Sequence, residues 1–347
     1  MADLSNFDPN CVGNPDNNIF GLPFTEDDAK LVIVPVPWEV TVSYGTGTSR
    51  APDAIFKASL QVDLYDTYAV DAWKQGYYMK PLERKKLAKS DYLRNEAELY
   101  IDYISKGECV DDNRFICKSL REINEGSVQM NEWVYENTKA LIEKGKLVAL
   151  LGGDHSTPLG FFKAQAEKHG SFGILQIDAH ADLREAYEGF KYSHASIMYN
   201  ALNEVENISK IVQVGVRDFG SDEYEYIQNS NGRVVTFFDA DIKERMCEGE
   251  AWKTIVNEIV AALPEKVHIS FDIDGLDPKL CPGTGTPVAG GFEVAQIIYL
   301  FKKVIESGRK LIGFDLVEVG VGETDWNANV GARLLYNMCG MLVKNNA

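Results

Sequence analysis

The sequence predicts an α/β fold in which helices cover both faces of a mostly parallel sheet of about eight strands, giving three layers. Two observations lead to this prediction. Short apolar runs recur along the 347 residues, and helical patterns fill the gaps between them. Runs that are nearly continuous in apolar residues, without alternation, are expected of parallel strands whose two faces are both covered. Alternation of strands with helices favours a layered α/β domain.

Seven apolar runs predict the strands of this sheet. They are Leu31–Val36, Leu147–Leu151, Phe172–Ile177, Ile211–Val216, Val234–Phe238, Val267–Phe271 and Leu311–Leu316. The segments between them predict helices, of which the clearest are Val128–Lys144, Pro158–His169, Ala251–Leu263 and Phe292–Ser307. A glycine or a proline follows each of these four segments, and both residues commonly end a helix.

Residues 74–127 break this rhythm. They hold a charge-rich stretch at 80–86 and a helix-compatible segment at Tyr92–Ser105. We interpret the range as a charged insertion within one domain that spans residues 1–347. It would cover the functional site, line a subunit interface or form a solvated excursion on the surface.

The composition excludes several classes of function. The formal net charge of −17 argues against a nucleic-acid partner, since such proteins need a basic surface. It mildly favours a cationic substrate, although an acidic surface that only aids solubility explains it as well. No apolar run approaches the roughly 20 residues of a membrane span. The first residues lack a signal peptide, and six scattered cysteines fit a reducing compartment, so we expect a cytoplasmic protein.

Potential metal ligands gather in three short segments, each of which follows a predicted strand. In open α/β sheets the ligand crevice lies outside the carboxyl ends of the strands, so these segments are expected to meet at one edge. Within two of these segments the potential ligands stand two residues apart. Alternate residues of extended backbone share a face, so these side chains are expected to point to the same side. The candidate ligands are His155, Asp178, His180, Asp182, Asp272 and Asp274.

The residue types indicate the kind of ion. Carboxylates together with imidazoles suit a hard or borderline divalent cation, and Mn²⁺ is a natural choice. Burying this many carboxylates without a cation would be very costly. A single Asp-x-Asp pair at a strand end is usually a cap or a turn, but the full set favours a two-metal hydrolytic centre. Two such ions generate a reactive hydroxide at neutral pH.

The motifs resemble those of the ureohydrolase superfamily, which contains arginases, agmatinases and formimidoylglutamases. The matching stretches are GGDHS at 152–156, DAHAD at 178–182, and SFDIDGLDP at 270–278 followed by residues 282–287. A fainter match covers Pro37–Ile55. The resemblance spans most of the chain, apart from an N-terminal extension of about residues 1–25 and the 74–127 insertion. It implies an arginase-like fold and a homo-oligomer, a trimer or a hexamer.

The resemblance implies a binuclear manganese site with two Mn²⁺ ions per chain. One ion would be held by His155, Asp178, Asp182 and Asp272. The other would be held by His180, Asp178, Asp272 and Asp274, so that Asp178 and Asp272 bridge the pair. Asp277 precedes a proline, and we interpret it as a turn residue and not as a ligand.

Three residues carry the implied chemistry. Glu318 matches the glutamate that holds the substrate guanidinium, a planar group with which a carboxylate forms paired hydrogen bonds. His194 matches the histidine that assists proton transfer, a task that suits its near-neutral pKa, although a surface loop residue is the alternative. A metal-bridging hydroxide would attack the guanidinium carbon, and a proton would reach the leaving amine through Asp182 and His194.

Two positions bear on the substrate. Arg184 and Gly220 stand where, in our alignment, arginases hold the α-carboxylate and α-amino groups, which argues against L-arginine. The runs 182–185 and 192–195 resemble agmatinases, including those that act on longer polyamine-like guanidines. We therefore expect a small cationic guanidino substrate, with agmatine first, cleaved to putrescine and urea. Formimidoylglutamase, arginase or another guanidino-acid hydrolase are alternatives, as are a non-catalytic subunit and a phosphoester hydrolase.

One departure from the family pattern and one charged residue concern the substrate pocket. After Glu318 the chain reads Val319–Asp325 in place of the usual Asn/Ser-Pro turn. Arg184, as a predicted substrate-binding residue, would repel an amine tail and could bind a carboxylate, unless Glu185 or Glu188 engages it.

Overall fold

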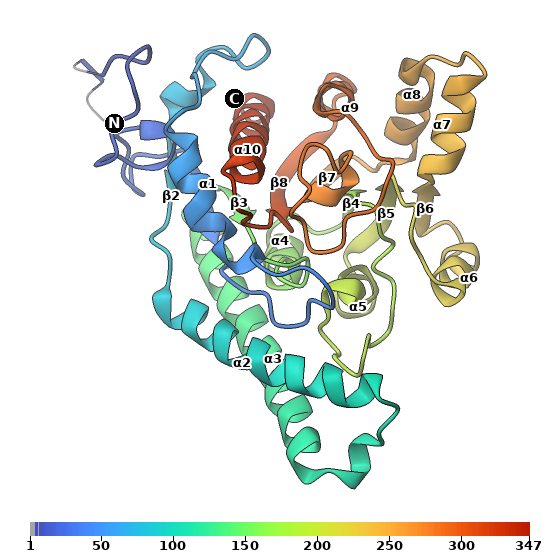
Figure 1. Ribbon diagram of the computed structural model, residues 1–347. Helices are drawn as coiled ribbons and strands as arrows, with labels where there is room; N and C mark the ends of the chain where they lie inside the picture. Colours follow the sequence, from blue (N-terminus) through green and yellow to red (C-terminus); the bar gives the residue numbers. More distant parts are fainter. Residues whose placement is uncertain (1–3, 6) are drawn as a thin grey trace.

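An eight-stranded sheet forms the centre of the computed structural model, which describes residues 4, 5 and 7–347 (Figure 1). The strand order is β2-β1-β3-β8-β7-β4-β5-β6, and every neighbouring pair is parallel. The strands are β1 (Leu31–Pro35), β2 (Tyr77–Met79), β3 (Leu147–Leu151), β4 (Phe172–Ile177), β5 (Ile208–Val214), β6 (Val234–Phe237), β7 (Lys266–Asp272) and β8 (Lys310–Val317).

Helices cover both faces of the sheet, which confirms the three-layer α/β prediction (Figure 1). One face packs against α1 (Ala51–Ser59), α7 (Asp239–Cys247), α8 (Trp252–Ala262), α9 (Val294–Glu306) and α10 (Trp326–Asn345). The other packs against α2 (Arg84–Ser105), α3 (Arg114–Glu143), α4 (Leu159–His169), α5 (Ile197–Glu204) and α6 (Ser221–Asn229). Leu31 and Ile33 of β1 join the first core and Val32 and Val34 the second, so the strand is apolar throughout.

All seven predicted strands are present, with small shifts at their ends such as the earlier start of β5 at Ile208. The eighth strand, β2, is an edge strand that pairs with β1. The sequence analysis did not predict it, because its three residues make no apolar run.

The range 74–127 contains β2, α2 and the first part of α3. In Figure 1 the two helices form a long hairpin that extends away from the sheet. The predicted helix Val128–Lys144 is the second part of α3, which begins at Arg114 after the Asn113 cap. The hairpin touches the loop before α5, since Asn124 hydrogen-bonds Gly189 and Lys191. That this range is an insertion stays a prediction.

The predicted N-terminal extension, residues 1–25, includes residues 1–3 and 6, which lie outside the described residues. Among the helices of the described chain, none combines the length and apolar character that crossing a membrane requires.

Candidate metal centre

The strand order explains why distant segments meet. Strands β3, β8, β7 and β4 are consecutive neighbours in the sheet. His155 lies in the loop after β3, Asp178 follows β4, Asp272 ends β7, and Glu318 follows β8. Because all four strands are parallel, their carboxyl ends lie side by side at one edge of the sheet, as expected for a ligand site in this class of fold.

His155 is the centre of the first group of candidate ligands. Its Nδ1 atom lies 3.0 Å from Asp178 Oδ2, 2.9 Å from Asp182 Oδ2 and 3.4 Å from Asp272 Oδ2. His155 and these three aspartates are all buried. The ligand atoms of His155, Asp178 and Asp182 lie close enough together to hold one metal ion.

His180 is the centre of the second group. Its Nδ1 atom lies 3.0 Å from Asp274 Oδ2 and 3.6 Å from Asp178 Oδ1. These three residues also lie close enough to hold one ion. Asp178 therefore presents one carboxylate oxygen to each imidazole, which is the arrangement expected of a bridging ligand. Asp272 accepts a hydrogen bond from the Asp274 N–H at 2.9 Å and contacts the first group through its other oxygen.

The electrostatics of both groups favour bound positive charge. Burial lowers the pKa of His155, but contacts with Asp178, Asp182 and Asp272 outweigh it and raise the pKa well above its ordinary value. Burial likewise opposes the charge on His180, yet Asp274 and Asp178 raise its pKa to about 12. The carboxylates hold protons on the imidazoles, and divalent cations would meet the same need. The donor set fits a pair of hard or borderline ions.

Asp182 has an unusual backbone and an unusual pKa. Its φ of 55° lies in the left-handed region, which is uncommon for a non-glycine residue. Its carbonyl accepts hydrogen bonds from the N–H groups of Met198 and Tyr199, at the start of α5. Burial, and then the neighbouring Asp178 carboxylate, raise the pKa of Asp182 to about 7. A carboxyl group of this kind can hold and release a proton near neutral pH.

Glu318 combines a strained backbone with an unpaired oxygen. Its φ is 62°, and its N–H donates to the carbonyl of Gly153 at 2.8 Å. Its Oε1 accepts a hydrogen bond from the His155 N–H at 2.9 Å, whereas its buried Oε2 has no hydrogen-bond partner among the described residues. Burial, and then Asp154 and Asp274, raise its pKa well above the ordinary value. A cationic ligand with N–H groups would donate to this oxygen and balance the negative charge of the carboxylate.

His194 lines a cavity of about 130 Å³ together with His180, Asp182 and Arg184. Its backbone N–H donates to Thr41 Oγ1 at 3.1 Å. Burial, and then the nearby charges of His180 and His155, lower the pKa of His194 to about 3. In this environment the imidazole is therefore neutral at pH 7.

Comparison with known proteins places the chain in a family. The sequence profile of the arginase family matches residues 29–340. The chain belongs to the arginase family. Enzymes of this family depend on a binuclear metal centre, so the protein is a metal-dependent amidinohydrolase of guanidino-type C–N bonds.

Three relatives illustrate the breadth of the family around this chain. N(1)-aminopropylagmatine ureohydrolase of Thermus thermophilus is 29% identical over 315 residues, covering 91% of each chain. Guanidinobutyrase of Pseudomonas aeruginosa is 33% identical over 238 residues, covering 63% of this chain and 70% of its own. The structure of agmatine ureohydrolase of Thermoplasma volcanium matches with a TM-score of 0.70 at 23% identity, over 92% of each chain.

Arg184 has a different partner from those considered in the sequence analysis. Its Nε atom lies 3.4 Å from Glu223 Oε2, and its guanidinium lies 4.7 Å from the ring centre of Tyr187. Glu223 also accepts hydrogen bonds from the N–H groups of Leu183 and Gly220. Glu223 therefore forms the ion pair with Arg184, because the start of α6 brings it to this side of the loop. Burial raises the pKa of Glu188, and the nearby charge of Arg184 partly offsets this rise.

A second, larger cavity lies beside the one that contains His180 and Asp182 in this arginase-family chain. Its volume is about 520 Å³, and it shares Arg184, Tyr187 and Glu223 with the smaller cavity. The rest of its wall includes acidic and aromatic side chains, among them Glu185, Glu188, Asp222, Tyr199 and Tyr226. Acidic side chains therefore outnumber the single arginine in the wall of this outer cavity.

Sequence reasoning missed several residues that contact the predicted ones. Ser270 meets His155 Nε2 at 2.9 Å, Gln176 donates to Asp178, and Thr41 holds His194. Two of these contacts had a sequence signal: Ser270 begins the SFDIDGLDP motif, and Glu223 is the third residue of a helix whose first turn is acidic. Asp277 caps a turn by accepting from the Lys279 N–H at 3.0 Å, which agrees with its interpretation as a turn residue.

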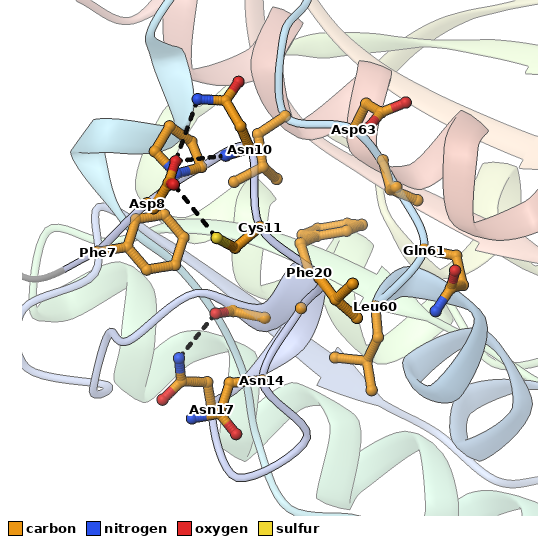
Figure 2. Close-up of a pocket in the computed structure, with 16 residues that line it drawn as sticks. Phe7, Asp8, Asn10, Cys11, Asn14, Asn17, Phe20, Leu60, Gln61 and Asp63 are labelled. Atoms are coloured by element: carbon orange, nitrogen blue, oxygen red, sulfur yellow. Dashed lines mark hydrogen bonds between the residues drawn. The ribbon is translucent and has the colours of Figure 1, made fainter.

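Another cavity, of about 380 Å³, lies between the N-terminal segment and Leu60–Leu64 (Figure 2). Asp8 is its main acidic side chain on the N-terminal side. The Asp8 carboxylate accepts local hydrogen bonds from Asn10 and Cys11, as Figure 2 shows. Its lining contains none of the predicted site residues, so we place the functional site at the carboxyl edge of the sheet.

Proposed function

We propose that the protein is a manganese-dependent agmatinase that cleaves agmatine to putrescine and urea. The observation that carries this proposal is Glu318 Oε2, a buried carboxylate oxygen that has no hydrogen-bond partner among the described residues. It belongs to the residue whose other oxygen holds the His155 N–H. A guanidinium group would supply the missing donors in a planar, bidentate geometry.

The ligand groups described above would hold two Mn²⁺ ions per chain, with Asp178 between them. When bound, such a pair lowers the pKa of water and so supplies a nucleophile at neutral pH. Glu318 would orient the guanidinium carbon toward the ligand groups. Asp182 and His194 line the same cavity, and we propose that they relay a proton to the leaving amine.

The wall of the outer cavity supports a substrate with a cationic tail. The charge of Arg184 is offset by Glu223, so Arg184 does not repel an amine as an unpaired guanidinium would. Glu185 and Asp222 then leave this wall with an excess of negative charge. The relatives named for agmatine and for N(1)-aminopropylagmatine agree with this choice.

A guanidino acid is the second candidate, because Arg184 remains 44% exposed and could turn toward a carboxylate. The guanidinobutyrase relative supports it. We also propose that the protein acts as a homo-oligomer, a trimer or a hexamer, which light scattering on the purified protein would measure.

A substrate panel tests the proposal. Manganese-loaded protein would be assayed for urea from agmatine, N(1)-aminopropylagmatine, 4-guanidinobutyrate and L-arginine, and for formamide from formimidoylglutamate. We expect kcat/KM for agmatine or for N(1)-aminopropylagmatine to exceed the values for 4-guanidinobutyrate and L-arginine by at least about 100-fold. Turnover of 4-guanidinobutyrate that is faster than that of agmatine and is lost in Arg184→Gln would establish the second candidate instead.

A further inference from the structure

A row of polar side chains crosses the sheet directly beneath the candidate metal centre. Thr236, Gln213, Gln176, Ser270 and Asp315 are successive register partners on strands β6, β5, β4, β7 and β8. Partners in register lie on the same face of a sheet. Four of the five, all except Thr236, are fully buried. Burying polar side chains in apolar strands costs free energy unless they form hydrogen bonds. The hydrogen-bond partners of this row therefore indicate what it does.

One branch of the row leads to Asp178. Thr236 Oγ1 donates to Gln213 Oε1 at 2.7 Å, and Gln213 Nε2 donates to Gln176 Oε1 at 2.7 Å. Gln176 Nε2 then donates to Asp178 Oδ2 at 2.8 Å. Gln213 Nε2 also donates to the carbonyl of Ala181 at 2.7 Å. The Ala181 carbonyl and the Asp178 carboxylate can only accept hydrogen bonds. Each therefore fixes the orientation of the glutamine amide that contacts it, so that Gln213 Nε2 faces Ala181 and Gln176 Nε2 faces Asp178.

The other branch leads to His155. Ser270 Oγ donates its proton to Asp315 Oδ1 at 2.9 Å, because a carboxylate can only accept. Ser270 Oγ is then the acceptor for His155 Nε2, which lies 2.9 Å away. Asp315 is held in turn by His268 at 2.6 Å. This branch keeps a proton on His155 Nε2 and so directs Nδ1 toward the aspartates, as ligating histidines require.

Both branches end at the same ion position. Asp178 Oδ2 and His155 Nδ1, the two atoms that the branches orient, lie 3.0 Å apart in the first ligand group. Apart from the shared Asp178, the second group receives from the row only a long contact, 3.4 Å from Gln176 Nε2 to the His180 carbonyl. We propose that the polar row is a positioning device for the His155 ion position, which it preorganises more strongly than the His180 position. The inference rests on the metal centre proposed above.

Gln213 offers the sharpest test, because it belongs to the row and contacts none of the candidate ligands' side chains. Gln213→Met keeps the length of the side chain and frees the Gln176 amide to rotate. Thr236→Val removes only the hydroxyl that orients Gln213. Thr138→Val is the matched control, since it also removes a threonine hydroxyl, one that donates to the Val134 carbonyl in α3 at 2.8 Å.

Chelator-treated proteins would be titrated with Mn²⁺ by calorimetry, with electron paramagnetic resonance to distinguish coupled pairs from single ions. We expect the wild type and Thr138→Val to bind two ions alike. Gln213→Met should bind one of the two ions about 10- to 100-fold more weakly and show single ions where the wild type shows pairs. Thr236→Val should weaken the affinity for the same ion by a smaller factor.

If Gln213→Met and Thr236→Val both bound the two ions with wild-type affinity, the proposed metal centre would stand and this inference would be overturned. Equal weakening of both ions, matched by a loss of stability in urea that the control shares, would also overturn it, because the row would then be merely structural. If Gln213→Met does not fold, Thr236→Val decides. Failure of the wild type to bind Mn²⁺ would overturn the proposed metal centre and this inference together. Failure to cleave agmatine would leave the inference standing.

Discussion

Asp182 and Glu318 show how single residues are prepared for a task. Both are non-glycine residues with positive φ, a conformation that costs about 1–3 kcal/mol each. Surrounding hydrogen bonds hold both in place: the amides at the start of α5 hold the Asp182 carbonyl, and Gly153 and His155 hold Glu318. Strain maintained in this way at two candidate catalytic residues fits a preorganised site.

The substitution Glu318→Gln tests the role of this residue as the guanidinium partner. The glutamine amide would keep an oxygen for the His155 N–H but lose the negative charge that a buried guanidinium needs. A broken buried ion pair costs about 3–5 kcal/mol, so kcat/KM should fall by at least about 100-fold while Mn²⁺ affinity stays within about threefold. Steady-state kinetics and a metal titration would measure this, with Glu185→Gln in the outer cavity as control. Unchanged kcat/KM would show that Glu318 does not bind the substrate.

The pKa values of the two ligand imidazoles predict a pH dependence of metal binding. The pKa of His155 is raised well above its ordinary value, and that of His180 is raised to about 12. Without metal, both imidazoles are therefore positively charged at neutral pH. Metal ions must displace these protons, so affinity should increase with pH, by about tenfold per unit for each proton released. Calorimetry in two buffers of different ionisation enthalpy would count the protons. An affinity that is constant between pH 6 and 8 would contradict this prediction.

At the scale of elements, close contact between loops positions the ligands. The loop after β3 carries His155 and runs against the segment after β1. A Cβ atom added to Gly153 would lie 1.9 Å from the Trp38 carbonyl oxygen, which leaves no room for a side chain. Gly153 of the GGDHS motif therefore permits the close approach of these two loops.

Gly153→Ala should force these two loops apart and displace His155. We expect destabilisation of at least about 1–3 kcal/mol, together with weaker Mn²⁺ binding. Urea denaturation and metal titration would measure both effects. Gly322→Ala is the matched control, because its added Cβ would meet Asn327 at an ordinary 3.4 Å. If the Gly153 variant matched the control in stability and affinity, close packing of these loops would not be needed for the site.

The same elements show what the sequence could and could not predict. The apolar runs predicted seven strands because continuous burial is a local property of the chain. Gln176 and Gln213 lie inside two of these runs, but their contact depends on the register between strands, which one strand alone does not encode. The contacts of Thr41 and Glu223 also join distant segments. The sequence therefore pointed to the candidate ligands that the structure brings together and missed the residues that contact them.

At the scale of the whole molecule, the bound ions should contribute to stability. The chain carries a formal net charge of −17 and buries several carboxylates at one edge of its sheet. A ligand that binds only the folded state, at 100 times its Kd, adds about 2.7 kcal/mol per site. Chelation should therefore lower the thermal midpoint, and added Mn²⁺ should restore it. Calorimetry would show this, and a midpoint that responds to neither treatment would contradict it.

The central claim is that two ions share Asp178 at the carboxyl edge of this sheet. Anomalous X-ray scattering at the manganese absorption edge, from crystals of manganese-loaded protein, tests it most directly. We predict two peaks per chain, one at His155, Asp178 and Asp182 and the other at Asp178, His180 and Asp274. A single peak, or peaks away from these residues, would contradict the binuclear centre.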